Sequence, residues 1–183
     1  LADEIHADFV RPGHKYTPFA SLPDKAIVDN SITFKAVTKT FNLPASKNAY
    51  WFTTNPIYFA RAKKNQRADI NTLGVVANEA AYRHGADWLD QLLVYIDGNH
   101  SFVENYLKTQ LPQVGYTRAE GTFLSWLHFD SVMDAAGVVE QAEASQRTAN
   151  PMSETQVFAA WLAQNCGVQL NHGADYGNGG RRC

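Results

Sequence analysis

The chain has little of what would mark it as a secreted, membrane or nucleic-acid-binding protein. Only two of its 183 residues are cysteines, Cys166 and Cys183, which is too few for a disulfide framework. No apolar run reaches the roughly 20 residues that a membrane-spanning helix needs. The 16 lysines and arginines nearly balance the 18 aspartates and glutamates, and the net charge is -2. This balance gives no electrostatic reason to expect a nucleic acid or a membrane surface as partner.

Signals for targeting and for metal binding are also missing. The opening residues lack the basic segment and apolar core of a signal peptide, so the cytoplasm is the expected location. The six histidines are scattered without the spacing of metal ligands, so no metal site is expected. The sequence begins without methionine on an apolar segment and stops just after the glycines Gly179 and Gly180. We therefore expect it to be a piece of a longer chain.

The residues that are present predict an α/β domain. Hydrophobic residues make up 45% of the chain and charged residues 19%, as in a globular protein with a core. Clusters of β-forming residues alternate with segments of helical periodicity, which is typical of α/β folds. Strands are expected at residues 26–38 with a turn at 29–30, at 49–54, at 121–129 and at 167–170. Helices are expected from residue 56, over 72–108 with a break at Gly85, within 131–150, and over 153–165.

Two of these helices have specific start signals. Pro56 suits the first turn of a helix that follows Asn55. Ser153 and Gln156 have the spacing of a capping box. The pattern of apolar and polar residues changes near residues 110–116, which indicates a change of domain at the end of the long helical region.

Lys39 and Asp3 form the most informative pair of residues. Lys39 stands between Thr38 and Thr40 after an apolar run, and it follows Asp3 by 36 residues. A lysine amine can form a Schiff base with pyridoxal phosphate (PLP), and a carboxylate can keep the pyridine nitrogen of that cofactor protonated. Taken singly, a lysine at a strand end is usually a surface residue, and an aspartate usually caps a turn. Lys35 could be mistaken for Lys39 but lacks the flanking threonines.

Four stretches of the sequence carry a resemblance to a known family. The chain resembles the fold-type I PLP-dependent enzymes of the aminotransferase class I/II superfamily, and among them the cystathionine β-lyase-like MalY/PatB group of C–S lyases. The resemblance covers nearly the whole chain but only the second half of such an enzyme. The matching stretches are Asp3–Asp8, Gly13–Ser21, Thr38–Asn42 and Glu120–Leu127.

The resemblance implies a role for five residues. Lys39 matches the Schiff-base lysine, which is also the catalytic base, and Asp3 matches the partner of the pyridine nitrogen. His6 matches the position that contacts the 3′ oxygen of the cofactor, and Thr38 matches a hydroxyl that supports the phosphate. Lys47 stands where many relatives have a phosphate-binding arginine, and it keeps the charge but not the bidentate geometry.

The resemblance also implies the domain organisation and the oligomeric state. Residues 1–72 would be the C-terminal part of the PLP-binding large domain, 73–111 the long linking helices, and 112–183 a small α/β domain that stops before its last strand. A homodimer is implied because these enzymes build their sites at a dimer interface. The glycine-rich phosphate-binding segment and the aromatic residue that stacks on the cofactor belong to the first half. The arginine for the substrate carboxylate would fall just past Cys183.

Three hypotheses for function remain open at this point. The first is a PLP-dependent C–S β-lyase that converts a cysteine-derived thioether, a small amino-acid substrate, to pyruvate, ammonia and a thiol. The second is an aminotransferase on the same scaffold, since residues that hold PLP do not decide which bond breaks. The third is a non-catalytic regulatory or binding protein with a PLP fold, which the presence of both Lys39 and Asp3 disfavours.

Overall fold

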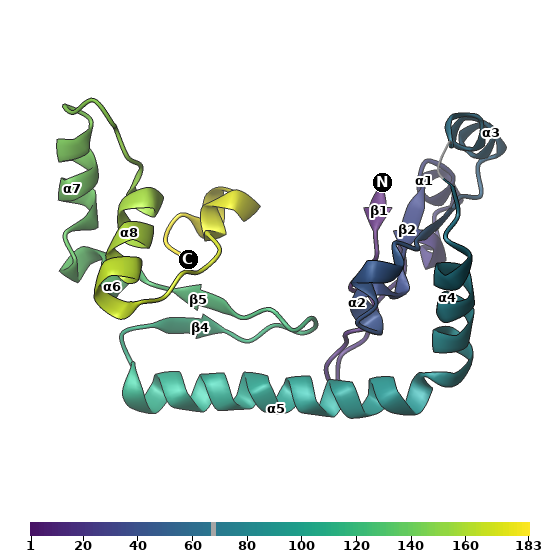
Figure 1. The fold of residues 1–183 in the computed structure, drawn as a ribbon, viewed down its shortest axis with the longest axis horizontal. Coiled ribbons are helices and arrows are strands. Elements are labelled where there is room, and N and C mark those ends of the chain that lie inside the picture. Colours follow the sequence, from purple (N-terminus) through teal and green to yellow (C-terminus); the bar gives the residue numbers. More distant parts are fainter. Residues whose placement is uncertain (67–68) are drawn as a thin grey trace. The chain divides into compact units, whose positions relative to one another are not determined.

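The computed structural model describes residues 1–66 and 69–183 and has the expected mixed α/β composition (Figure 1). The chain divides into two compact units, residues 1–99 with 120–123 and residues 100–119 with 124–183. In the described residues, no helix is long and apolar enough to cross a membrane. The strands are β1 (Ala2–Asp3), β2 (Thr33–Lys35), β3 (Tyr50–Phe52), β4 (Gly115–Thr117) and β5 (Trp126–His128). The helices are α1 (Lys25–Asp29), α2 (Val37–Thr40), α3 (Pro56–Asn65), α4 (Thr72–His84), α5 (Ala86–Gln110), α6 (Asp130–Ala135), α7 (Val138–Ser145) and α8 (Glu154–Cys166).

A three-stranded sheet organises the first unit, in the order β1-β2-β3. Strand β1 pairs in parallel with β2, and Asp3 lies opposite Phe34 in this pair. Strand β2 pairs antiparallel with β3. Because β1 and β2 run in parallel, the segments that follow them leave from the same edge of the sheet. These two segments carry His6 and Lys39.

The expected strand over residues 26–38 is wrong in most of its length. Residues 26–28 belong to helix α1, because the Asp24 carboxylate accepts hydrogen bonds from the backbone N–H groups of Ala26 and Ile27. A capping side chain of this kind satisfies donors that a strand would leave to a partner. The strand is limited to Thr33–Lys35, and Val37 already begins helix α2.

The long helical region and its break are confirmed. Helices α4 and α5 cover the expected range, and Gly85 lies between them. A Cβ atom on Gly85 would stand 2.5 Å from the Ala81 carbonyl oxygen and 2.5 Å from the ring of Phe41, so no side chain fits there. The start of α3 is confirmed as well, since the Asn55 side chain accepts from the next two free backbone N–H groups.

The second unit has a two-stranded antiparallel sheet, β4 with β5, and the helices α6, α7 and α8. The capping box of Ser153 and Gln156 is confirmed at the start of α8. The expected strand over 121–129 shrinks to Trp126–His128 because residues 120–123 pack in the first unit, where the Thr122 N–H donates to the Phe9 carbonyl. The strand expected at 167–170 is wrong, since Gly167 ends α8 in the left-handed conformation and no strand follows it among the described residues.

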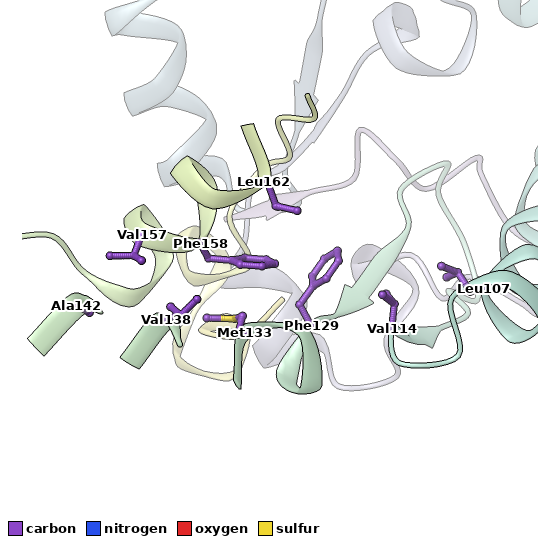
Figure 2. Close-up of a cluster of buried hydrophobic side chains, with 9 residues drawn as sticks. All are labelled: Leu107, Val114, Phe129, Met133, Val138, Ala142, Val157, Phe158 and Leu162. Atoms are coloured by element: carbon purple, nitrogen blue, oxygen red, sulfur yellow. The ribbon is translucent and has the colours of Figure 1, made fainter. Parts of the chain in front are cut away.

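The hydrophobic core of the second unit is a cluster of nine buried side chains, which Figure 2 shows converging from several elements. Met133 of α6 is 1% exposed and Val138 of α7 is 0% exposed. The other members are Leu107, Val114, Phe129, Ala142, Val157, Phe158 and Leu162. This cluster joins the end of α5 to α6, α7 and α8, so it determines the stability of the unit.

Truncation of Met133 tests the role of this cluster. Met133→Ala is expected to lower the free energy of unfolding by about 2–5 kcal/mol, because it removes buried methylene groups and leaves a cavity. Chemical denaturation of the intact protein measures this change. Val168 is 42% exposed, so Val168→Ala, the matched control, should stay within about 0.5 kcal/mol of the wild type. Equal effects of the two substitutions would contradict the assignment of this core.

Candidate active site

A tight turn after β1 brings His6 close to Asp3. Asp3 ends the strand, and its Oδ1 accepts a hydrogen bond of 3.2 Å from the backbone N–H of Ile5, as in an Asx turn. The backbone N–H of Phe9 then donates to the His6 carbonyl at 3.1 Å. Glu4 is buried and its Oε1 accepts from the Phe19 N–H at 2.7 Å, which fixes the turn to the following loop. The Asp3 carboxylate itself remains exposed.

Lys39 lies in the one-turn helix α2, directly after β2. Its neighbour Thr40 and the first residue of the helix, Val37, are both 0% exposed, whereas Lys39 is exposed. In the part of the chain that the structure describes, the Lys39 ammonium makes neither a hydrogen bond nor a salt bridge. Lys35, in contrast, is paired with Asp8, with its Nζ 3.4 Å from Oδ1. The two lysines therefore have different environments: Lys35 is paired with a carboxylate, and Lys39 is not.

The His6 ring is held between two aromatic side chains. Its centroid lies 6.0 Å from that of Phe9 and 5.4 Å from that of Phe123. Burial of the ring lowers the pKa of His6 below its usual 6.5, the positive charge of Lys39 lowers it further, and the negative charge of Asp3 opposes both. The imidazole is therefore neutral at pH 7 and lies within electrostatic range of both Lys39 and Asp3. Its Nδ1 is buried and has no hydrogen-bond partner within residues 1–66 and 69–183.

Two cavities of the first unit contain these residues. One, of about 240 Å³, is lined by Asp3 and His6. The other, of about 410 Å³, is lined by Thr38 and Lys39. Phe9 lines both of them. Lys47, which is exposed, is not among the residues that line either cavity. The structure thus brings four of the five expected residues to two neighbouring cavities and places the fifth outside them.

Some side chains around these cavities had no clear signal in the sequence. Asp8 is the acceptor for both Lys35 and the Thr40 hydroxyl, with a distance of 2.7 Å from Thr40 Oγ1 to Oδ2. Phe123 lines the Lys39 cavity from a segment 84 residues further along the chain. Only the position of Asp8, two residues after His6 in the same turn, could have singled it out. Phe123 needed the tertiary structure.

Comparison with known proteins shows what the whole chain is similar to. Searched against family models, the chain matches none. It is 34% identical to the cystathionine β-lyase PatB of Bacillus subtilis over 184 residues, which cover 98% of this chain and 42% of PatB. It is 28% identical to the protein MalY of Escherichia coli over 134 residues, covering 69% of this chain and 33% of MalY. The chain is homologous to PatB and MalY. It spans less than half the length of these relatives.

Solved structures agree with this homology. Cystalysin from Treponema denticola, whose structure contains PLP, matches with a TM-score of 0.79 and 26% identity over 97% of this chain and 41% of its own. A PLP-bound C–S lyase from Staphylococcus hominis matches with a TM-score of 0.81 and 25% identity over 98% of this chain and 42% of its own. The fold of this PatB homologue is therefore that of the corresponding part of a fold-type I PLP-dependent enzyme.

Titration of His6 tests the geometry of the site directly. By NMR, the pKa of the His6 imidazole in this PatB homologue is expected to lie below 6.5. Lys39→Met should raise this pKa, because it removes one positive charge, but not to its usual value, because the contribution of burial remains. Lys25→Met, which removes an exposed charge at the start of α1, is the matched control and should leave the pKa unchanged.

The lowered pKa of His6 also determines the direction in which the stability of the fold changes with pH. Because the unfolded chain binds the His6 proton more tightly than the folded chain, folding is favoured above pH 6.5. This contribution is lost as the pH falls from 6.5 through the lowered pKa of the folded state. His6→Asn should flatten that part of the stability profile. An unchanged profile would contradict a lowered pKa of the partly buried His6 imidazole.

Proposed function

We propose that this chain carries the cofactor lysine and part of the active site of a PLP-dependent C–S β-lyase. The substrate would be a cysteine-derived thioether, and the products pyruvate, ammonia and a thiol. The observation that carries the proposal is the free ammonium of Lys39 within electrostatic range of the neutral His6, beside Asp3. The naming of PatB as a cystathionine β-lyase and of the Staphylococcus hominis relative as a C–S lyase supports it.

The residues present fit PLP in three respects. The buried Nδ1 of His6 lacks a partner within the described residues, and a buried polar atom of this kind is satisfied when an oxygen of a bound group reaches it. Lys39 has a free amine, as covalent attachment requires. Thr38 lines the same cavity as Lys39 and can offer its hydroxyl to the phosphate. Lys47 lines neither cavity, so the structure gives no contact in support of its expected role.

When bound, PLP supplies an electron sink for negative charge that develops at the substrate Cα. The Asp3 carboxylate would keep the pyridine nitrogen protonated, because an adjacent negative charge favours the protonated form. The His6 imidazole, neutral because of its burial and the charge of Lys39, can donate one hydrogen bond without adding a positive charge. The Lys39 amine would hold the cofactor and would accept the proton that leaves the substrate Cα.

An aminotransferase remains the second candidate. The fold is shared with an aminotransferase from Staphylococcus aureus, with a TM-score of 0.72 at 16% identity. The residues that hold the cofactor are compatible with both reactions, because the bond that breaks depends on how the substrate is oriented.

A product assay separates the two reactions. The intact protein, loaded with PLP, is incubated with L-cystathionine, and pyruvate is measured with and without an added keto acid. The lyase hypothesis predicts pyruvate in the absence of any keto acid. Consumption of L-cystathionine only when the keto acid is present, without release of pyruvate, would contradict the lyase and favour the aminotransferase.

We also infer, from the resemblance to fold-type I enzymes, that the protein acts in the cytoplasm as a homodimer. Light scattering of the purified intact protein tests the assembly. A mass of two chains is expected, and a monomer that retains full activity would contradict this inference.

A further inference from the structure

Asp8 connects the two segments that carry the proposed site. It lies in the turn that contains His6, and its two carboxylate oxygens have different partners. Oδ2 accepts a hydrogen bond from Thr40 Oγ1 at 2.7 Å, and Oδ1 lies 3.4 Å from Lys35 Nζ. Thr40 is the residue next to Lys39 and is 0% exposed, so the donor end of this hydrogen bond is shielded from water.

Helix α2 cannot hold its own position. It has only four residues, and its N-cap, Ala36, offers no side-chain hydrogen bond. Helices this short have almost no stability of their own in water, so tertiary contacts must orient them. Two side chains of α2, Val37 and Thr40, are buried. Val37 anchors the helix through apolar packing, which leaves the hydrogen bond of Thr40 as its directional contact to the His6 turn.

The charges around Asp8 favour the same interpretation. The Asp8–Lys35 pair is only partly exposed, with 23% of the Asp8 and 21% of the Lys35 side chain accessible. Lys35, the last residue of β2, therefore has Asp8 as its partner. Burial of the Tyr82 ring and its hydrogen bond with Tyr50 raise the pKa of Tyr82, and the negative charge of Asp8 raises it further. The Asp8 carboxylate is thus held by one residue of α2 and one residue of β2.

We propose that Asp8 is a positioning residue that acts through Thr40 to orient Lys39 toward His6 and the cofactor. This inference deepens the proposed function and rests on it for the role of the cofactor. The hydrogen bond fixes the end of α2 against the turn that carries His6, so that the amine of Lys39 and the imidazole of His6 face a common group.

The variants separate the hydrogen bond from the ion pair. Thr40→Val removes the hydroxyl and keeps the Asp8–Lys35 pair, whereas Thr40→Ser keeps a hydroxyl at the same place. Lys35→Met removes the ion pair and keeps the hydrogen bond to Thr40. Asp8→Glu keeps the charge but displaces the carboxylate by one methylene, which gives a second test if Thr40→Val does not fold.

Two readouts are taken from the intact protein. The first is the concentration of PLP at which half of the protein has formed the borohydride-reducible lysine adduct. Thr40→Val should raise this concentration about tenfold. This is the effect expected when one hydrogen bond to a charged acceptor is lost. Asp8→Glu should change it in the same direction. Thr40→Ser and Lys35→Met should stay within about threefold of the wild type, since each keeps the hydrogen bond.

The second readout, the pKa of His6 in the cofactor-free protein, does not depend on activity. Thr40→Val should raise this pKa, because a displaced Lys39 charge lowers it less, and Thr40→Ser should restore it. A His6 pKa and a PLP requirement that are both unchanged in Thr40→Val would overturn the inference. If the wild type forms no adduct at all, the proposed function fails, and the His6 titration alone then decides whether Asp8 positions Lys39.

Discussion

Lys39→Ala is expected to abolish covalent attachment of PLP and to lower β-lyase activity by at least about 10³-fold. The substitution removes the only group proposed to hold the cofactor covalently, and with it the base that acts at the substrate Cα. The visible absorbance of the PLP-loaded protein and the rate of pyruvate formation from L-cystathionine measure the two losses.

Lys25→Ala is the matched control for Lys39→Ala. Lys25 is exposed and is the first residue of α1. The Lys25→Ala variant should keep both the absorbance band and the activity. Retention of a borohydride-sensitive band by Lys39→Ala would show that another lysine, for instance Lys35, carries the cofactor. That result would contradict the assignment of the site.

Asp3→Asn has the second largest expected effect, a decrease of about 10²-fold in the rate of pyruvate formation. The substitution keeps the shape of the side chain and an oxygen that can accept from the Ile5 N–H, but it removes the charge. An ion pair at about 4 Å contributes ~1 kcal/mol in water and ~4 kcal/mol at an effective dielectric constant of about 20. Each 1.4 kcal/mol corresponds to about tenfold in rate. Asp3 is exposed in this structure, and a carboxylate that a bound cofactor would partly cover falls between these limits.

The control for Asp3→Asn is Asp90→Asn, which removes an exposed carboxylate from α5. It should leave the rate unchanged. The adduct with Lys39 should still form in Asp3→Asn, since the amine is intact, so loss of rate and loss of attachment are separated. A wild-type rate in Asp3→Asn would mean that the pyridine nitrogen has another partner.

The longer helices were predicted well because their signals are local, whereas α1 and α2 were expected to be part of a strand. Asn55 with Pro56, Ser153 with Gln156, and Gly85 each fix a helix end through neighbouring backbone groups. The strands were predicted less well, since a strand forms only where a partner exists. Residues 26–28 have β-forming side chains, but the cap at Asp24 turned them into a helix. Residues 167–170 have no neighbouring strand in the described part of the chain.

The part of the candidate site that could be predicted is the part that depends on the separation of residues along the chain. Asp3 ends β1 and Lys39 lies just after β2, and these strands pair in parallel, so both residues lie at one edge of the sheet. The contacts of Asp8 with Thr40 and Lys35 depend on how α2 packs, which no local pattern encodes. Lys47 was chosen by its distance from Lys39 along the chain, and the structure places it outside both cavities.

The most direct test of the central claim is to locate the cofactor on the chain. The intact protein is incubated with PLP, reduced with borohydride and digested, and the peptides are examined by mass spectrometry. We expect one pyridoxyl group, attached to Lys39. A label on Lys35 or on any other lysine, or no label on a protein shown to be folded, would contradict it.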